Sequence, residues 1–263
     1  MQPFRLRKIT IKTIARGLVT ITVFIVLWEL IIWGTSIPHY LLPGPMEVLR
    51  AWGKWSEVIL QHASVTLLEI VLGLIIGTMV GIVSATIIAQ VRAARRWLLP
   101  VLVVSQAIPV FAIAPLLVMW LGYGIASKIA MAALIIYFPV TASFLDGLRR
   151  TDPGWLDLVQ IMTSKTSGNS WAALRLVRVP AAMPSLASGI RVAAAVAPIG
   201  AVVGEWVGSG AGLGYLMLHS NARTQIDVMF AALVTLAVIA VALYFTVDWL
   251  MRHLVAWQSD TFS

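Results

Sequence analysis

The sequence predicts an all-α, polytopic membrane protein with six transmembrane helices and a further short helix in one cytoplasmic loop. Of its 263 residues, 60% are hydrophobic and only 11% are charged, whereas soluble domains carry about 25% charged residues. A soluble fold of this composition would expose a large apolar surface to water and would aggregate. Six long apolar runs and a one-sided distribution of basic residues support the same fold class.

The six apolar runs are each long enough to cross the hydrocarbon core of a bilayer, which takes roughly 20 residues of helix. Segments in lipid must satisfy their own backbone hydrogen bonds, so the runs are predicted to be helices. Their predicted ranges are 17–34, 64–90, 97–121, 127–146, 184–204 and 228–250. The membrane domain, 17–250, is thus expected between a basic N-terminal segment, 1–16, and a tail, 251–263. The first run is interpreted as an uncleaved span, because it is longer than a signal core and no A-x-A site follows it.

Fourteen of the 19 basic residues fall on one side of the predicted membrane domain. They are Arg5, Arg7, Lys8, Lys12, Arg16, Arg92, Arg95, Arg96, Arg149, Arg150, Lys165, Arg175, Arg178 and Arg252. Loops rich in Lys and Arg stay in the cytoplasm, so both termini are predicted to be cytoplasmic. Because these residues alternate with apolar runs and form no basic stripe with interleaved aromatics, no nucleic-acid partner is predicted.

The residue inventory argues against catalysis by this chain. It has no cysteine, and no two of its histidines have metal-ligand spacing, so no metal site is predicted. It contains no G-x-x-x-x-G-K-[ST] phosphate loop, and no acid, base and nucleophile groups cluster in the sequence. No catalytic residue and no cofactor are therefore expected. A secondary carrier and a membrane-embedded enzyme are the competing classes.

Glycines and prolines mark two of the predicted spans. In the second span, Gly73, Gly77 and Gly81 recur every four residues, and such a small-residue face lets another helix approach closely in lipid. These glycines predict a helix-packing seam. In the third span, kinks are permitted by three prolines that each remove a backbone donor, namely Pro100, Pro109 and Pro115.

Ionisable residues inside a membrane are costly and tend to face the protein interior or water. The predicted spans and their ends contain five of interest, Glu29, Glu69, Arg191, Glu205 and Asp248. Glu205 lies beside Trp206 near the outer end of the fifth span, where a cationic or hydrogen-bonding solute could meet it. Arg191 could pair with Glu69 or with another carboxylate. Glu205, Trp206, Arg191 and Glu69 form the candidate substrate path, with structural salt bridges or snorkelling as the alternative for each.

The loop 147–183 is too long to be a simple connector. Within it, Trp155, Leu158, Val159 and Met162 recur on one helical face, and Asp152 followed by Pro153 predicts where that helix begins. A turn is expected over 164–170, followed by a second short helical pattern, 171–177. Pro180 is expected to end that pattern, and Pro184 to open the fifth span. The apolar stripe fits either an interfacial helix on lipid headgroups or a docking element for a soluble partner.

The segment 158–193 resembles the cytoplasmic loop of binding-protein-dependent ABC importer permeases, whose pattern is E-A-A-x3-G-x9-I-x-L-P. It keeps a Pro180-to-Pro184 end and the Gly-Ile-Arg at 189–191. It departs where Gln160, Ile161 and Met162 replace E-A-A, and Gly168 is one residue too close to Pro180. The resemblance implies a coupling helix whose register the departures leave open.

Three further blocks resemble the nitrate, sulfonate and taurine branch of that family. They are Leu-Pro-Gly-Pro at 42–45 with Val48, Ile-Pro at 108–109 through 129, and Gly-Glu-Trp at 204–206 through Leu216. The stretch 204–233 looks closest to permeases for the pyrimidine precursor of thiamine. The solute implied is such a pyrimidine, with a sulfonate, taurine or nitrate as the alternative.

The resemblance also implies the partners. A type I ABC importer permease lies in the bacterial cytoplasmic (inner) membrane, where a separate ATPase subunit would dock on the coupling loop. An extracytoplasmic solute-binding protein would deliver the solute, and a second permease copy, most simply as a homodimer, would complete the pore. The residues implied in coupling are Trp155, Leu158, Val159, Gln160, Met162, Gly168 and Pro180.

Overall fold

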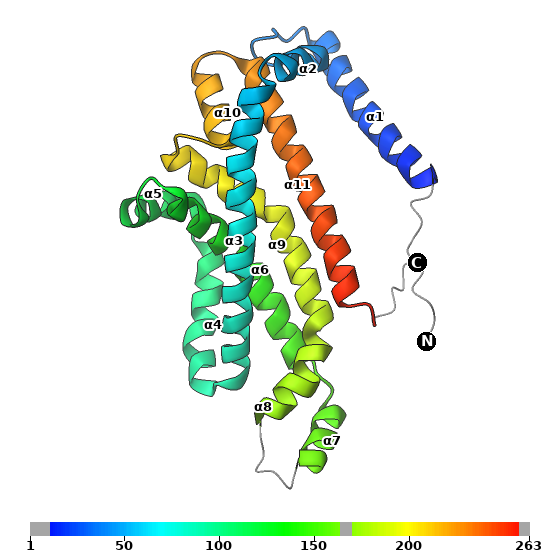
Figure 1. Cartoon of the computed structure of the whole chain (residues 1–263), viewed down its shortest axis with the longest axis vertical. Helices are drawn as coiled ribbons and strands as arrows, with labels where there is room; N and C mark the ends of the chain where they lie inside the picture. The colour runs from blue at the N-terminus through cyan, green and yellow to red at the C-terminus, as the bar shows by residue number, and fades with distance from the viewer. Residues whose placement is uncertain (1–10, 164–169, 258–263) are drawn as a thin grey trace.

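The structure is a computed structural model that describes residues 11–163 and 170–257. Within these ranges the secondary structure is helical (Figure 1). The elements are α1 (Ile11–Thr35), α2 (Pro45–Lys54), α3 (Ser56–Gln90), α4 (Arg92–Ala107), α5 (Val110–Leu121), α6 (Ile125–Arg149), α7 (Pro153–Thr163), α8 (Ser170–Ala173), the π-helical turn η1 (Leu174–Arg178), α9 (Val179–Gly208), α10 (Leu213–Ala222) and α11 (Ile226–Leu254). The predicted all-α membrane fold is confirmed.

The centre of the molecule is formed by α3, α6 and α9, with α6 packed along both of the others. Small residues allow this close approach. A Cβ atom added at Gly77 of α3 would lie 2.9 Å from the carbonyl oxygen of Ala133 in α6, and one added at Gly200 of α9 would lie 2.6 Å from the Cα atom of Ala132. Gly73 and Gly81 likewise face α6. The glycine face of the second predicted span therefore lies in a helix–helix contact.

Five helical segments within the described ranges are long and apolar enough to cross a membrane. They are Ala15–Thr35, Ser56–Gln90, Ile125–Arg149, Trp171–Gly208 and Ile226–Leu254, and the shorter apolar helix Val110–Leu121 accompanies them. The third predicted span, 97–121, is wrong as a single helix, since α4 ends at Ala107 and α5 begins at Val110. Pro109 has no N–H to donate and disfavours helical geometry at Ile108, whose ψ is 120°. Figure 1 shows α5 turned away from the direction of α4.

The beginning of the fifth span also differs from the prediction. Pro180 does not end a separate short helix, because α8, η1 and α9 follow one another without a break. Pro180 is the second residue of α9, directly after η1, and Pro184 lies inside the helix instead of opening it. The second span begins at Ser56, eight residues before the expected start. Neither α2 nor α10 was predicted.

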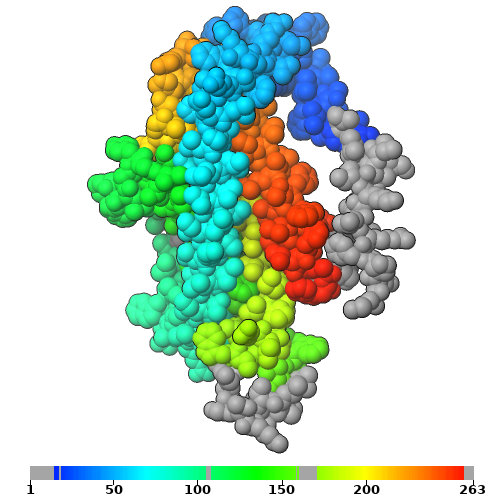
Figure 2. Space-filling view, viewed as in Figure 1, coloured from blue at the N-terminus to red at the C-terminus, as the bar shows by residue number. Residues whose placement is uncertain are grey.

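The molecule has two distinct ends (Figure 1). One end carries α2 and α10, and the opposite end carries α7, α8 and the junction between α3 and α4. Figure 2 shows α1 leaning away from α11 on the face in view and meeting the other helices near α2. Its apolar side chains are exposed, as at Phe24 and Trp33. We call these the α2–α10 end and the α7–α8 end.

Candidate functional site

A short helical hairpin, α7 followed by α8, forms the α7–α8 end. The helix α7 begins at Pro153, as the Asp152–Pro153 pair predicts, and the N–H of Gly154 donates to the Asp152 carboxylate over 2.8 Å. Trp155 is 60% exposed, while Val159 is half-buried. Leu158, Gln160 and Met162 lie on α7. Gly168 lies outside the described residues.

The second arm of the hairpin adds more exposed apolar surface. Trp171 is 64% exposed and, with Ala172, Arg175 and Leu176, lines a shallow depression. Leu174 points the other way and is buried in the main core. Pro180, two residues after η1, is exposed. The hairpin thus presents indole and aliphatic side chains outward while one leucine anchors it to the bundle.

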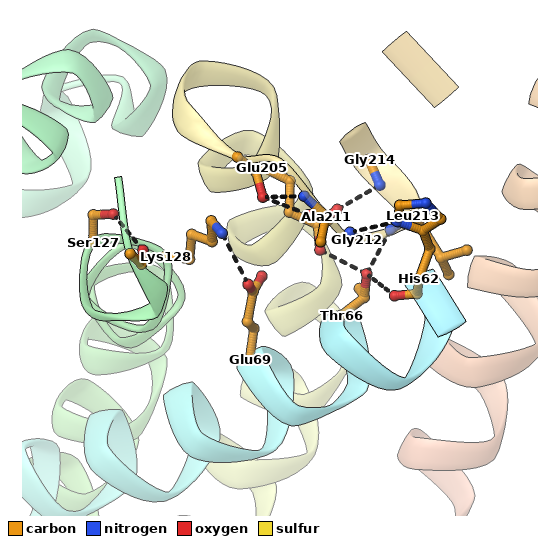
Figure 3. Close-up of polar contacts among 12 residues, drawn as sticks. His62, Thr66, Glu69, Ser127, Lys128, Glu205, Ala211, Gly212, Leu213 and Gly214 are labelled. Atoms are coloured by element: carbon orange, nitrogen blue, oxygen red, sulfur yellow. Dashed lines mark hydrogen bonds and ion pairs between the residues drawn. The ribbon is translucent and has the colours of Figure 1, made fainter. Parts of the chain in front are cut away.

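A buried group of polar side chains joins four helices towards the α2–α10 end (Figure 3), and we call it the polar junction. It consists of His62, Thr66 and Glu69 of α3, Lys128 of α6, Glu205 of α9, and the backbone of 212–214 at the start of α10. In it, the Lys128 ammonium lies 3.4 Å from the Glu69 carboxylate, and both side chains are buried. This ion pair ties α3 to α6.

Glu205 is the centre of the polar junction and is only 1% exposed. One carboxylate oxygen, Oε1, accepts a hydrogen bond of 2.6 Å from the Thr66 hydroxyl. The other oxygen, Oε2, accepts a hydrogen bond from the Gly214 N–H. The Leu213 N–H donates to Thr66 Oγ1 over 2.7 Å, and the Gly212 N–H donates to His62 Nδ1 over 2.9 Å. Burial of the Glu205 carboxylate and of these three backbone N–H groups is tolerable because each has a hydrogen-bond partner.

The turn between α9 and α10 is shaped around this carboxylate. Gly212 has a φ of +111°, a backbone conformation that L side chains rarely adopt. A Cβ atom added there would collide with the Glu205 carboxylate, and one added at Gly214 would lie 2.7 Å from Oε2. On the opposite side, Gly204 packs against the backbone of Lys128. Of these glycines, Gly212 is the most constrained, because it combines a positive φ with the closest approach to the Glu205 carboxylate.

Of the candidate path residues, Glu69 and Glu205 both belong to the polar junction. Arg191 does not reach Glu69. It pairs with Asp248 of α11 at 2.7 Å, the second of the two pairings considered for it. Trp206 is half-exposed. Glu29 is exposed on α1.

Sequence reasoning missed His62, Thr66 and Lys128 as members of the polar junction. His62 precedes the predicted start of its span, 64–90, and Lys128 lies at the very beginning of the predicted span 127–146. A signal was present in the Gly-Leu-Gly at 212–214, which follows Glu205 closely in one of the family-like blocks. Within the described ranges, no three His, Asp or Glu side chains are grouped so as to hold a metal ion.

A bundle of long apolar helices with buried charged groups where its helices meet belongs to the polytopic membrane proteins. Comparison with known proteins defines the family. Residues 77–259 match the binding-protein-dependent transport system inner membrane component, and the chain belongs to this family. The resemblance found in the sequence is thereby confirmed.

Individual relatives agree with this assignment. A "probable ABC transporter permease protein" of Haemophilus influenzae is 53% identical over 91% of this chain and 96% of its own length. The riboflavin transport system permease protein RibX of Chloroflexus aurantiacus is 35% identical, over 92% of this chain and 90% of its own. The formylaminopyrimidine transport permease protein ThiX of Halalkalibacterium halodurans is 32% identical, over 89% and 92%. The chain is a multi-pass ABC transporter permease subunit, a transport component and not an enzyme.

Proposed function

We propose that this permease imports a small nitrogen heteroaromatic solute of the pyrimidine type, related to the pyrimidine precursor of thiamine. Two relatives above 30% identity are named for formylaminopyrimidine and for riboflavin. The ring system of riboflavin contains a fused pyrimidine ring, so the two names share this chemical feature. Agreement between these names over most of the chain is the observation that carries the proposal.

A sulfonate, taurine or nitrate is the alternative cargo. A "putative aliphatic sulfonates transport permease protein" of Bacillus subtilis and a taurine transport system permease protein of Escherichia coli are each 27% identical to this chain, less than the two relatives named for riboflavin and formylaminopyrimidine. The pyrimidine-type solute is therefore the better supported of the two classes.

We further propose that the α7–α8 hairpin faces the cytoplasm and receives a separate ATPase subunit. Basic residues gather at this end, and Arg95 donates to the last carbonyl groups of α3, at Ile88 and Ala89. Cytoplasmic loops are enriched in such residues. The exposed Trp155 and Trp171 offer apolar surface for a soluble partner. Nucleotide-driven closure of two ATPases would then move the hairpins and the helices attached to them.

The family assignment supports the following proposal for the remaining parts of the importer. Both termini are cytoplasmic, the membrane is the bacterial inner membrane, and the α2–α10 end faces the solute-binding protein. One chain supplies half of the pore, so a second copy completes it as a homodimer. The exposed apolar residues of α1 provide surface for lipid or for that second copy.

Uptake by the purified, reconstituted system tests the proposal. The permease, its ATPase and its binding protein are placed in proteoliposomes, and uptake of labelled hydroxymethylpyrimidine and of labelled taurine is measured with and without ATP. We expect pyrimidine uptake that requires ATP and is not inhibited by excess taurine. Taurine uptake with no pyrimidine uptake would favour the alternative cargo. Uptake that needs an ion gradient and no ATP would instead identify a secondary carrier.

A further inference from the structure

The amino end of α10 is held by side chains from two other helices. The first N–H groups of any helix lack an acceptor within the helix, and this end carries a partial positive charge. A local Ser, Thr, Asp or Asn usually caps such an end, but the capping position of α10 is Gly212, which has no side chain. Three successive N–H groups, at 212, 213 and 214, instead donate to His62, Thr66 and Glu205.

The Glu205 carboxylate makes its hydrogen bonds to groups of the protein itself. Both of its oxygens accept hydrogen bonds from the protein, and the side chain is almost fully buried. A negatively charged group near a helix amino end is stabilised by the helix dipole. The glycines at 212 and 214 allow the backbone to approach the carboxylate, as a Cβ atom at either position would overlap it. The geometry suits a carboxylate that caps α10 better than one that meets a solute.

We propose that Glu205 is a positioning residue that caps α10 from a different helix and clamps α10 to α3 and α9. The clamp acts through Thr66, which accepts from Leu213 and donates to Glu205. This proposal does not depend on which solute is transported. It extends the proposed function by naming the side chains that fix the α2–α10 end of the permease.

The clamp also positions three neighbouring aromatic rings, those of His62, Tyr215 and His219. Tyr215 lies 5.8 Å from the ring of His62 and 5.2 Å from the ring of His219, with which it is stacked. His62 Nδ1 accepts from the Gly212 N–H, so the proton of the neutral ring is on Nε2. The same backbone turn that binds Glu205 therefore orients His62, and α10 carries the other two rings. Release of α10 would separate Tyr215 and His219 from His62.

The effect of a Glu205→Gln substitution follows from the hydrogen bonds available. The Gln carbonyl oxygen can accept from Gly214, and its amide can donate to Thr66. The Thr66 hydroxyl then has a second acceptor, the His62 carbonyl oxygen at 3.2 Å. Glu205→Gln thus keeps a hydrogen bond to Gly214 and one to Thr66, the latter with its direction reversed, and removes the charge, whereas Glu205→Ala and Thr66→Val remove hydrogen bonds.

Spin labelling tests the clamp directly. The chain has no cysteine, so a single introduced cysteine is the only site that carries the nitroxide. A nitroxide on Asn221→Cys, at the exposed far end of α10, reports the mobility of this helix in nanodiscs. A nitroxide on Lys54→Cys, in α2 at the same end, is the control. We expect Thr66→Val and Glu205→Ala to raise the mobile fraction at position 221 by at least roughly fivefold, the effect of losing a helix cap. Thr66→Ser should leave it within roughly twofold. Glu205→Gln should raise it less than Glu205→Ala does, because it loses only the interaction of the charge with the helix dipole. The label at position 54 should not change.

The outcomes separate a cap from a solute contact and from general destabilisation. If position 221 stays immobile in Thr66→Val and Glu205→Ala, Glu205 does not hold α10 and the proposal is overturned. An equal rise at positions 221 and 54 also overturns it, because the loss would then be global. Should Glu205→Ala fail to insert, Thr66→Val and Thr66→Ser still decide the matter. None of these readouts uses a solute, so failure of the pyrimidine proposal would leave them unaffected.

Discussion

The Lys128 ammonium in α6 lies 3.4 Å from the Glu69 carboxylate in α3, and the protein buries both side chains. Taking a charge out of water is costly, so each charge of such a buried pair is stabilised mainly by the opposite charge of its partner. Removing one partner leaves the other charge uncompensated. Removing both leaves a neutral contact of similar shape. This asymmetry makes the pair a direct test of the polar junction.

We therefore expect Lys128→Met to destabilise the protein by about 3–5 kcal/mol, the usual cost of leaving a buried charge unpaired. The double variant Lys128→Met/Glu69→Gln should recover most of this loss. Thermal unfolding in detergent measures both, and Lys54→Met, which removes an exposed lysine, is the matched control. A Lys128→Met protein as stable as the Lys54→Met control would contradict the buried pair.

The packing of α3 on α6 gives a second prediction. A Cβ atom at Gly77 would lie 2.9 Å from a backbone carbonyl oxygen of α6, which cannot move as a side-chain end can. Gly77→Ala should therefore lower stability by about 1–3 kcal/mol, the cost of overpacking a core. Gly34→Ala in α1 is the control, since nothing lies within 4 Å of its added Cβ. Thermal midpoints of the two variants decide the point, and equal midpoints would mean that α3 and α6 are not in close contact.

Some of this architecture could be predicted because it depends on local sequence. Length and apolarity are local properties, and they predicted five of the spans. Most of the predicted ends of these spans fall within a few residues of the observed helix ends. The glycines at 73, 77 and 81 mark a face because the helix repeat brings residues four apart together. The division at Pro109 was expected only as a kink. Whether a proline bends a helix or ends it depends on the residues packed around it.

The polar junction could not be predicted because its members are far apart in the chain. Thr66 and Glu205 are separated by 139 residues, and no periodicity connects them. His62 lies outside the apolar run that defined its span, although the helix extends to Ser56. The helices α2 and α10 were missed because each has only ten residues, too few for a search based on membrane spans. Glu205 was selected as an ionisable residue near the outer end of a span where a solute could meet it, and its burial and capping partners became visible only in the fold.

The hairpin at the α7–α8 end predicts a variant that loses coupling and keeps its fold. Trp155 and Trp171 are both mostly exposed, so Trp155→Glu/Trp171→Glu should change the thermal midpoint little. We expect this variant to lose co-purification with the ATPase subunit, because charge replaces the apolar docking surface. Trp257→Glu, which alters an exposed tryptophan near the carboxyl end, should co-purify normally. If the double variant still binds the ATPase and supports ATP-driven uptake, the hairpin is an interfacial element on lipid and not the docking site.

The turn between α9 and α10 provides a closely matched pair of glycines. Gly212 has a positive φ and faces the Glu205 carboxylate, whereas a Cβ atom at Gly210, two residues earlier, would meet open space. Gly212→Ala should therefore be destabilising by about 1–3 kcal/mol, through backbone strain and displacement of the carboxylate. Gly210→Ala should be neutral or slightly stabilising, because alanine restricts the unfolded chain. Thermal unfolding of the two single variants, compared with Gly212→Ala in a Glu205→Ala background, separates the two causes. If strain alone acts, the cost of Gly212→Ala is the same in both backgrounds. If the carboxylate contributes, the cost falls once Glu205 is shortened, since the added methyl group then has room.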